Sequence, residues 1–199
     1  MTPLWLHGWP LDQHQWDAEV ARFGGTAVRL YGRGASIDGW AAQILSEAQG
    51  DDLALVGSSM GGYAALAITR RAPERVRAIV LAASKAAPDT PERKAFRDRL
   101  IENLRENGAP PNAAAGVTID ELATAQAAIR DRDDTTDVVR AFAGAFVVCA
   151  GTQDELMRPR EADELAALAP NGRAVQFATG HFVNLEDPDG FHALLESVL

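Results

Sequence analysis

The sequence predicts an α/β fold built on a doubly wound, mostly parallel sheet of about six strands. Short, nearly continuous apolar runs alternate with helical patterns, as in sheets whose strands are covered on both faces. At residues 57–61, Gly-Ser-Ser-Met-Gly joins an apolar run to a small-residue helical run. This is the strand–turn–helix setting of a G-x-S-x-G motif. We therefore expect one domain over residues 1–199, with a serine at the edge of its sheet.

The predicted strands and helices follow one another in regular alternation. The strands are the apolar runs at residues 4–7, 27–31, 53–56, 76–82, 145–150 and 174–178. The helices between and after them cover residues 16–22, 37–48, 60–71, 159–168 and 188–199. Pro73 and Gly172 punctuate the ends of two of these helices. The alternation indicates βαβ units in a single sheet.

Residues 85–137 interrupt this alternation. The segment is rich in charge and alanine and contains no predicted strand. Two helices are expected, at residues 90–107 and 118–132, with a break at Gly-Ala-Pro-Pro-Asn between them. We expect a small helical cap inserted between two strands, which would overhang the ligand crevice of an α/β sheet. The alternative is that the insertion only packs against the sheet edge.

Composition and charge exclude several classes of partner. The formal net charge is −9, which argues against nucleic acid and gives no reason to expect a membrane surface. The single cysteine, Cys149, lies in an apolar run and is expected to be a buried thiol. No apolar run approaches the length of a membrane span, and no leader pattern precedes the first strand. A cytoplasmic location is therefore expected.

Ser59 is the predicted nucleophile of the motif. Glycine stands two positions before it and two after it, which lets neighbouring backbone approach the turn. Ser58 would need glycine where Val56 and Met60 stand. A turn that merely joins strand to helix is the alternative on these five residues alone, so the interpretation depends on partners elsewhere in the chain.

A histidine must take the serine proton, and His181 is the predicted base. It lies in a turn after the last predicted strand, on the sheet edge where Ser59 also emerges. The other three histidines are expected to have structural or surface roles. His7 belongs to the first strand and its turn, His14 to a polar stretch, and His192 to the last helix.

The carboxylate that orients the histidine is expected to follow the preceding strand. Asp154 lies in the polar turn after that strand, and its role would be to hold the imidazole tautomer. Glu155 is the neighbouring rival and is expected to be solvated, while Asp89 is a more distant candidate from another strand end. The chain order Ser59, Asp154, His181 is the one expected for this type of elbow.

Two backbone donors are expected to stabilise the oxyanion. One is the N–H of Met60, the residue after the nucleophile. The other is the N–H of Trp9, in the loop after the first strand, because Gly8 permits an unusual backbone and Pro10 has no N–H. Taken alone, this loop reads as an ordinary turn with an aromatic residue that packs.

With these motifs in this order, the chain resembles the α/β-hydrolase superfamily over nearly its whole length. The motifs are His-Gly-Trp-Pro at 7–10, Gly-Ser-Ser-Met-Gly-Gly at 57–62, Gly-Thr-Gln-Asp at 151–154 and Gly-His-Phe at 180–182. The chain is most similar to small cofactor-free bacterial esterases and enol-lactonases, among them a carboxylesterase of biotin synthesis. The resemblance implies the same roles for Ser59, Asp154, His181, Trp9 and Met60.

The chain also departs from the pattern of that superfamily. Relatives often have two further strands before the one that carries the His-Gly turn, so the sheet is expected to be trimmed at its N-terminal edge. The loop at 31–36 lacks the aspartate that often precedes its Gly-x-Gly, and the insertion at 85–137 is shorter than many caps. Because caps and loops line the substrate pocket, the substrate of a relative is not carried over.

The sequence thus predicts a serine hydrolase that cleaves a small carboxylic ester, thioester or lactone through an acyl-enzyme, without a metal or organic cofactor. Trp9, Met60 and Phe182 are the expected pocket residues. Carbon–carbon bond hydrolysis and perhydrolysis on the same scaffold are alternatives, followed by a ligand-binding module without turnover. A nucleotide-binding protein is disfavoured, because residues 57–62 lack the G-x-G-x-x-G spacing and no P-loop lysine follows. The natural substrate and the oligomeric state stay open.

Overall fold

The computed structural model describes residues 1–199 and contains one six-stranded sheet in which all neighbouring strands are parallel. In spatial order the strands are β2 (Thr26–Val28), β1 (Thr2–Leu6), β3 (Leu53–Ser58), β4 (Val76–Ala82), β5 (Ala145–Gly151) and β6 (Gly172–Phe177). The predicted doubly wound parallel sheet is therefore confirmed.

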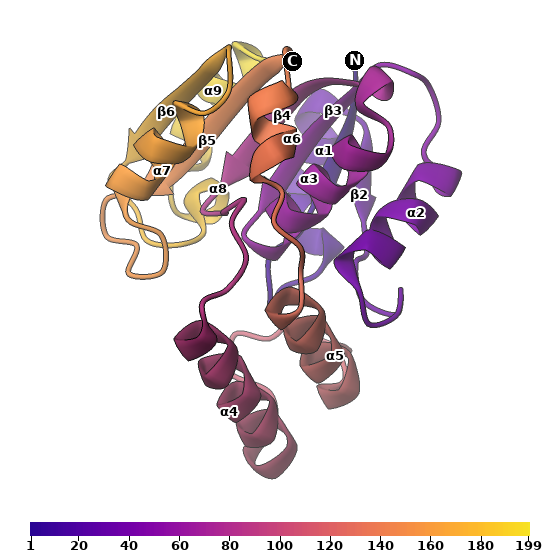
Figure 1. Cartoon of the computed structure of the whole chain (residues 1–199), viewed down its shortest axis with the longest axis vertical. Coiled ribbons are helices and arrows are strands. Elements are labelled where there is room, and N and C mark those ends of the chain that lie inside the picture. Colours follow the sequence, from indigo (N-terminus) through magenta and orange to yellow (C-terminus); the bar gives the residue numbers. More distant parts are fainter.

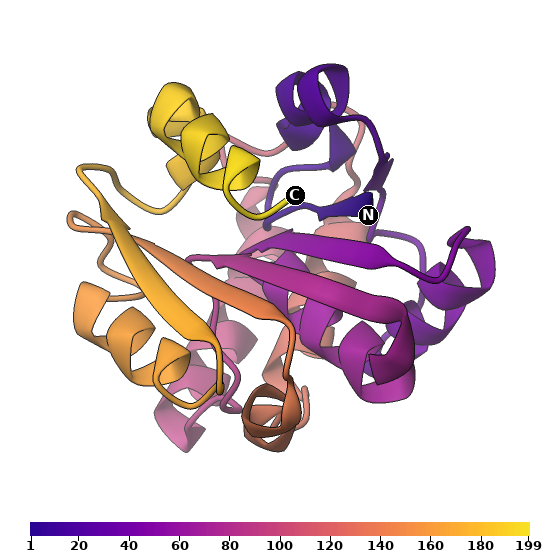
Figure 2. The ribbon, with the colours of Figure 1, turned by 90° about the horizontal axis from the view of Figure 1, so that it is seen from above.

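Helices cover both faces of this sheet (Figure 2). One face carries α1 (Asp17–Phe23) and α9 (Pro188–Glu196), and the other carries α2 (Ile37–Glu47), α3 (Met60–Arg71), α6 (Thr136–Ala141) and α7 (Pro159–Ala166). Successive strand residues point to opposite faces, so Val148 joins the larger core cluster while Val147 and Cys149 join the smaller one. Burial raises the pKa of the Cys149 thiol to about 12, as expected of an inert core cysteine.

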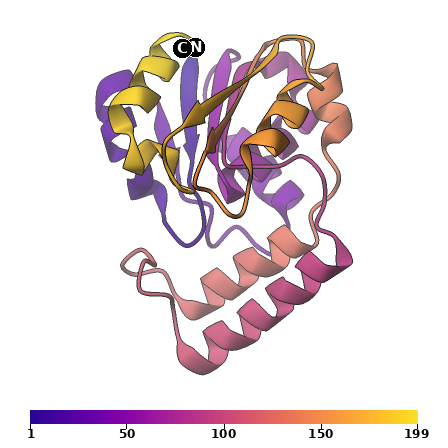
Figure 3. The same ribbon diagram turned by 90° about the vertical axis from the view of Figure 1, so that its left-hand side faces the viewer.

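Two long helices lie beyond one end of the sheet (Figures 1 and 3). They are α4 (Pro91–Asn107) and α5 (Ile119–Arg130), which pack side by side and connect β4 to β5. Thr90 begins α4 by accepting the Arg93 N–H, and a capping box between Thr118 and Glu121 begins α5. None of the helices combines the length and apolar character that crossing a bilayer requires.

Several boundaries differ from the sequence prediction. Strand β2 ends at Val28, because the N–H of Leu30 leaves the sheet and donates to Nε2 of His7. The short helices α6 and α8 (Val183–Glu186) were not predicted, and neither were two 3-10 turns, η1 (Gln13–Trp16) and η2 (Pro73–Arg75). Helices this short carry too few residues for a clear apolar period.

The backbones of β1, β3 and α3 meet without side chains between them. A Cβ atom added to Gly61 would overlap the carbonyl oxygen of Leu6, and one added to Gly57 would overlap the backbone of Gly61 and Gly62. The two glycines of the G-x-S-x-G motif are thus required by close approach. They set the start of α3 directly against the end of β1.

Replacing Gly61 with alanine is expected to lower the free energy of unfolding by about 3 kcal/mol, because the new methyl group meets rigid backbone. Gly39→Ala is the matched control, since Gly39 also lies in the first turn of a helix but its added Cβ meets only the side-chain oxygen of Ser36. The control should stay within about 1 kcal/mol of the wild type. Urea denaturation measures both, and similar losses in the two variants would contradict this packing.

His7 is fully buried at the end of β1 and uses both ring nitrogens within the protein. Its Nε2 accepts the Leu30 N–H at 3.0 Å, so Nδ1 carries the proton and donates to the carbonyl of Gly8 at 3.1 Å. Burial lowers the pKa of His7 from its ordinary 6.5 to about 4. His7 is therefore a neutral, structural histidine at pH 7.

The buried state of His7 predicts a stability that depends on pH. Between pH 6.5 and 4 the unfolded chain binds a proton at His7 that the folded chain does not. The free energy of unfolding should therefore fall by about 3 kcal/mol on acidification through this window. Urea denaturation at several pH values, compared with His7→Gln, isolates this contribution. Equal pH slopes in the two proteins, or an NMR titration of the His7 ring with its midpoint near 6.5, would contradict it.

Candidate active site

Ser59 is the single residue between β3 and α3, and its backbone is strained. Its φ of 47° and ψ of −107° are rarely adopted by a serine. Its N–H donates to the carbonyl of Ala82 at 2.7 Å, and its own carbonyl accepts the Gly62 N–H at 3.0 Å and the Ser84 hydroxyl at 2.8 Å. Three hydrogen bonds therefore hold the turn in this conformation.

Ser58 and Ser59 have different surroundings. Ser58 is the last residue of β3, and its hydroxyl is buried without a hydrogen-bond partner. Ser59 lines the cavity at the carboxyl end of the sheet, and Ser58 does not. Only Ser59 can thus be reached by a molecule in this cavity.

His181 and Asp154 form a hydrogen-bonded pair. Nδ1 of His181 lies 2.7 Å from Oδ2 of Asp154, whose side chain is only 1% exposed. The other carboxylate oxygen accepts the backbone N–H groups of Leu156 at 2.7 Å and Met157 at 3.2 Å. The carboxylate is thus held on both sides, and it fixes the orientation of the His181 ring.

Asp154 is ionised despite its burial. Burial alone would raise the pKa of its carboxyl group, but the hydrogen bond and charge interaction with His181 and the two backbone N–H groups oppose that effect. The net result is a pKa below the ordinary value. A negative charge therefore faces the Nδ1 side of the imidazole.

The two other candidate acids do not contact His181. Glu155 is exposed to solvent, as expected. Asp89 is buried but binds the guanidinium groups of Arg97 and Arg132 in the helical insertion. Of the acids considered from the sequence, the structure brings only Asp154 to His181.

The remaining histidines lie away from this cavity. His14 is exposed beside Asp17, and His192 is mostly buried, with Nε2 lying 3.2 Å from a carboxylate oxygen of Glu19. Neither lines the cavity that contains Ser59.

Glu186 clamps the loop that carries His181, a role that sequence reasoning missed. One of its carboxylate oxygens accepts the Gly180 N–H at 2.6 Å and the other accepts the Phe182 N–H at 3.1 Å. The residues on both sides of His181 are thereby fixed. The sequence offers no signal for this contact beyond an acidic residue shortly after the histidine.

A buried amide network supports the loop after β1. The Gly8 N–H donates to Oε1 of Gln15 at 2.8 Å, and Nε2 of Gln15 donates to Oδ1 of Asn184 at 3.0 Å. Asn184 in turn donates to the backbone carbonyl of Gln15 at 3.1 Å. The loop after β1 is thus tied to α8, the helix that follows His181, and this network was also missed from the sequence.

Ser59 and His181 line one cavity of about 720 Å³. Trp9 and Phe182 line it as well, together with residues of α4 and α5. The indole of Trp9 also donates to the Leu122 carbonyl of α5 at 3.3 Å. No hydrogen bond joins Ser59 to His181 in this structure, and hydrogen bonds of this kind often tighten only when substrate is bound.

The cavity lies where the chain changes direction across the sheet. The order β2-β1-β3-β4 means that the connections after β1 and β3 leave toward opposite sides. Ligands of open α/β sheets bind at such a switch point, at the carboxyl ends of the strands.

The side chain of Met60, expected in the pocket, is instead fully buried in the larger core cluster, because α3 packs onto the sheet from its first turn.

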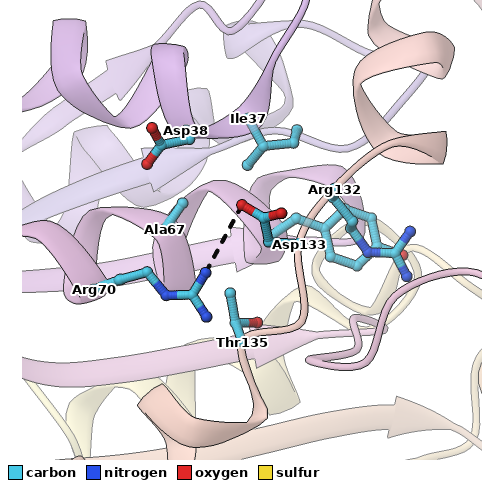
Figure 4. A pocket seen from close by; sticks show the side chains of 8 residues that line it. Ile37, Asp38, Ala67, Arg70, Arg132, Asp133 and Thr135 are labelled. Atoms are coloured by element: carbon cyan, nitrogen blue, oxygen red, sulfur yellow. Dashed lines mark ion pairs between the residues drawn. The ribbon is translucent and has the colours of Figure 1, made fainter.

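A second, much smaller cavity shares one wall residue with the first and is shown in Figure 4. Its volume of about 20 Å³ is large enough only for a water molecule. Tyr63 lines both cavities, and Arg70 faces Asp133 across the small one at 4.0 Å. Nowhere in the molecule are three His, Cys, Asp or Glu side chains grouped so that they could hold a metal ion.

Comparison with solved structures shows the same fold in several proteins. An esterase from Thermogutta terrifontis, solved with malate bound, is 24% identical, with a TM-score of 0.82 over 100% of this chain and 90% of that chain. An enol-lactonase from Burkholderia xenovorans is 18% identical, with a TM-score of 0.84 over 98% and 90%. MenH from S. aureus is 18% identical, with a TM-score of 0.86 over 100% and 93%. No curated protein matches the chain significantly.

Sequence comparison with known families gives the assignment. The match to the alpha/beta hydrolase family covers residues 4–194, which extend from β1 into α9. Because the match spans nearly the whole chain and the structure has the parallel sheet of that fold, the protein belongs to the alpha/beta hydrolase family.

Proposed function

We propose that this protein is a serine hydrolase that cleaves small carboxylic esters, thioesters or lactones. The observation that carries the proposal is the shared cavity. Ser59, strained and pinned at the end of β3, lines the same cavity as His181, whose ring is fixed by the ionised Asp154. A hydroxyl, an imidazole and a carboxylate in this relation are the parts of a catalytic triad.

In the proposed mechanism, Oγ of Ser59 attacks the carbonyl carbon of the substrate. Nε2 of His181 takes the hydroxyl proton and later gives it to the leaving alcohol or thiol. Asp154 holds the proton on Nδ1 and stabilises the imidazolium, without taking the proton itself. Water, activated by the same histidine, then releases the acid from the acyl-enzyme.

The oxyanion would be stabilised by the backbone N–H groups of Met60 and Trp9. Met60 is the first residue of α3, so its N–H has no acceptor within the helix and lies at the positive end of the helix dipole. The Trp9 N–H donates to no acceptor within the protein. Each such donor typically contributes about 3 kcal/mol to transition-state stabilisation.

The helical pair α4–α5, within residues 85–137, is proposed to act as the cap of this site. Side chains of both helices line the cavity above Ser59, and the indole of Trp9 is tied to α5. Esterases and an enol-lactonase are among the proteins of this fold, which supports ester or lactone cleavage as the proposed reaction. The pinned serine and the fixed His181 argue against a binding module without turnover.

Ser59→Ala is expected to reduce kcat for a short-chain p-nitrophenyl ester by about 10⁴-fold or more, because the hydroxyl that attacks the carbonyl carbon is removed. Ser58→Ala is the matched control and should stay active, since its hydroxyl is buried and unbonded. A fluorophosphonate probe should label the wild type and Ser58→Ala only. If Ser58→Ala loses activity and labelling instead, the nucleophile is Ser58 and not Ser59.

Asp154→Asn should lower kcat by about 10³- to 10⁴-fold, because an amide no longer stabilises the imidazolium and favours the wrong tautomer. Glu155→Gln should leave kcat within about twofold, since Glu155 is exposed and makes no contact with His181. The same ester assay measures both variants. An inactive Glu155→Gln beside an active Asp154→Asn would assign the acid to the neighbouring residue.

A further inference from the structure

Three cationic side chains line the cavity around Ser59, although the chain as a whole is acidic. Lys85, Arg93 and Arg97 line it, and Glu92 is the only acidic residue among its lining side chains. The formal net charge of the chain is −9, so this concentration of positive charge is not a general property of its surface. Charges that line a recessed cavity act on a ligand more strongly than exposed ones.

Two of these three cations already have carboxylate partners. Nζ of Lys85 lies 2.5 Å from Oε1 of Glu161. Arg97 binds the buried Asp89 and donates to Oε1 of Gln126 at 2.7 Å. Their charges are therefore largely compensated within the protein.

Arg93 forms no direct ion pair, and its charge interacts with the carboxylate of Glu161 only at longer range, since Glu161 is bonded to Lys85. The only hydrogen bond of its guanidinium group is a long one, 3.5 Å, to the backbone carbonyl of Leu156. A guanidinium group carries five N–H donors in one plane, so most of those of Arg93 stay uncommitted. The side chain is half-buried at the cavity wall, where it is less well hydrated than on the open surface.

The position of Arg93 in its helix does not account for its charge. Arg93 lies in the first turn of α4, where the positive end of the helix dipole disfavours a cation. The helix start is capped by Thr90, whose side chain accepts the backbone N–H of Arg93. The guanidinium thus contributes nothing to the start of the helix. An anion in the cavity would accept hydrogen bonds from its free N–H groups and balance its charge.

We propose that the substrate of this hydrolase carries a second, free carboxylate, and that Arg93 binds it. The proposal rests on the proposed function and names the substrate class of the same site. The planar guanidinium matches a carboxylate through two parallel hydrogen bonds, which makes Arg93 a specificity-determining residue. Of the three cations on this wall, Arg93 is the one whose charge is left for a ligand, because Lys85 and Arg97 are paired within the protein. The volume of about 720 Å³ suits a small dicarboxylic monoester.

The test compares two esters that differ only in charge. Monomethyl glutarate carries a free carboxylate, and methyl 4-carbamoylbutanoate replaces that carboxylate with a neutral amide of the same shape. The wild type should hydrolyse the charged ester with a kcat/KM about 10-fold higher or more, as expected for hydrogen bonds to a charged group. Monomethyl succinate and adipate cover the neighbouring lengths, and added salt should reduce the preference.

Arg93→Gln should abolish the preference for the charged ester by raising its KM. It should leave kcat/KM for the neutral ester, methyl 4-carbamoylbutanoate, within about twofold of the wild-type value. Arg99→Gln is the matched control, because Arg99 lies on the same helix, is exposed and does not line the cavity. It should keep the wild-type preference. If Arg93→Gln lowers kcat/KM for both esters equally, Arg93 has a structural role and the proposal is overturned.

The two proposals fail in different ways. If the wild type cleaves p-nitrophenyl acetate but shows no preference for any of the charged esters, the carboxylate inference is wrong and the serine hydrolase stands. If the wild type cleaves no ester and the fluorophosphonate does not label Ser59, the proposed function is wrong, and the inference falls with it.

Discussion

At the start of α3, three segments of backbone touch with no side chain between them. Gly57 and Gly61 allow β1, β3 and α3 to come together at this point, and the turn between the last two is so tight that one residue forms it. That residue, Ser59, takes a positive φ that serine rarely adopts. The hydrogen bonds to Ala82, Gly62 and Ser84 oppose this strain, so the side chain is presented to the cavity by the surrounding backbone rather than by its own preference.

Two histidines at the same edge of the sheet show how environment sets their state. His7 is fully buried, both its ring nitrogens are bonded to backbone groups, and it is held neutral. His181 is partly exposed, has one nitrogen on an ionised carboxylate, and makes no hydrogen bond within the protein through the other. The first ring organises the loop that follows β1, while the second keeps one ring nitrogen free of any hydrogen bond within the protein.

Local sequence patterns were enough to predict the sheet, the elbow and the neighbourhood of His181, because each depends on residues close together in the chain. The contacts that fix these parts in space were not predictable in the same way. Gln15 and Asn184 are far apart in sequence and meet only once α8 has packed beside the loop after β1. The clamp by Glu186 likewise depends on the path of a loop. The burial of Met60 depends on how α3 settles onto the sheet.

The helical pair α4–α5 leaves the sheet after β4 and returns to it at β5, the hydrogen-bonded neighbour of β4. Its two ends are therefore held together by the sheet, whatever the length of chain between them. For an inserted segment whose two ends are fixed in this way, doubling the number of residues costs only about 0.6 kcal/mol in loop-closure entropy. Segments of very different size can thus be exchanged at this point during evolution, while the strands that hold Ser59, Asp154 and His181 keep their places.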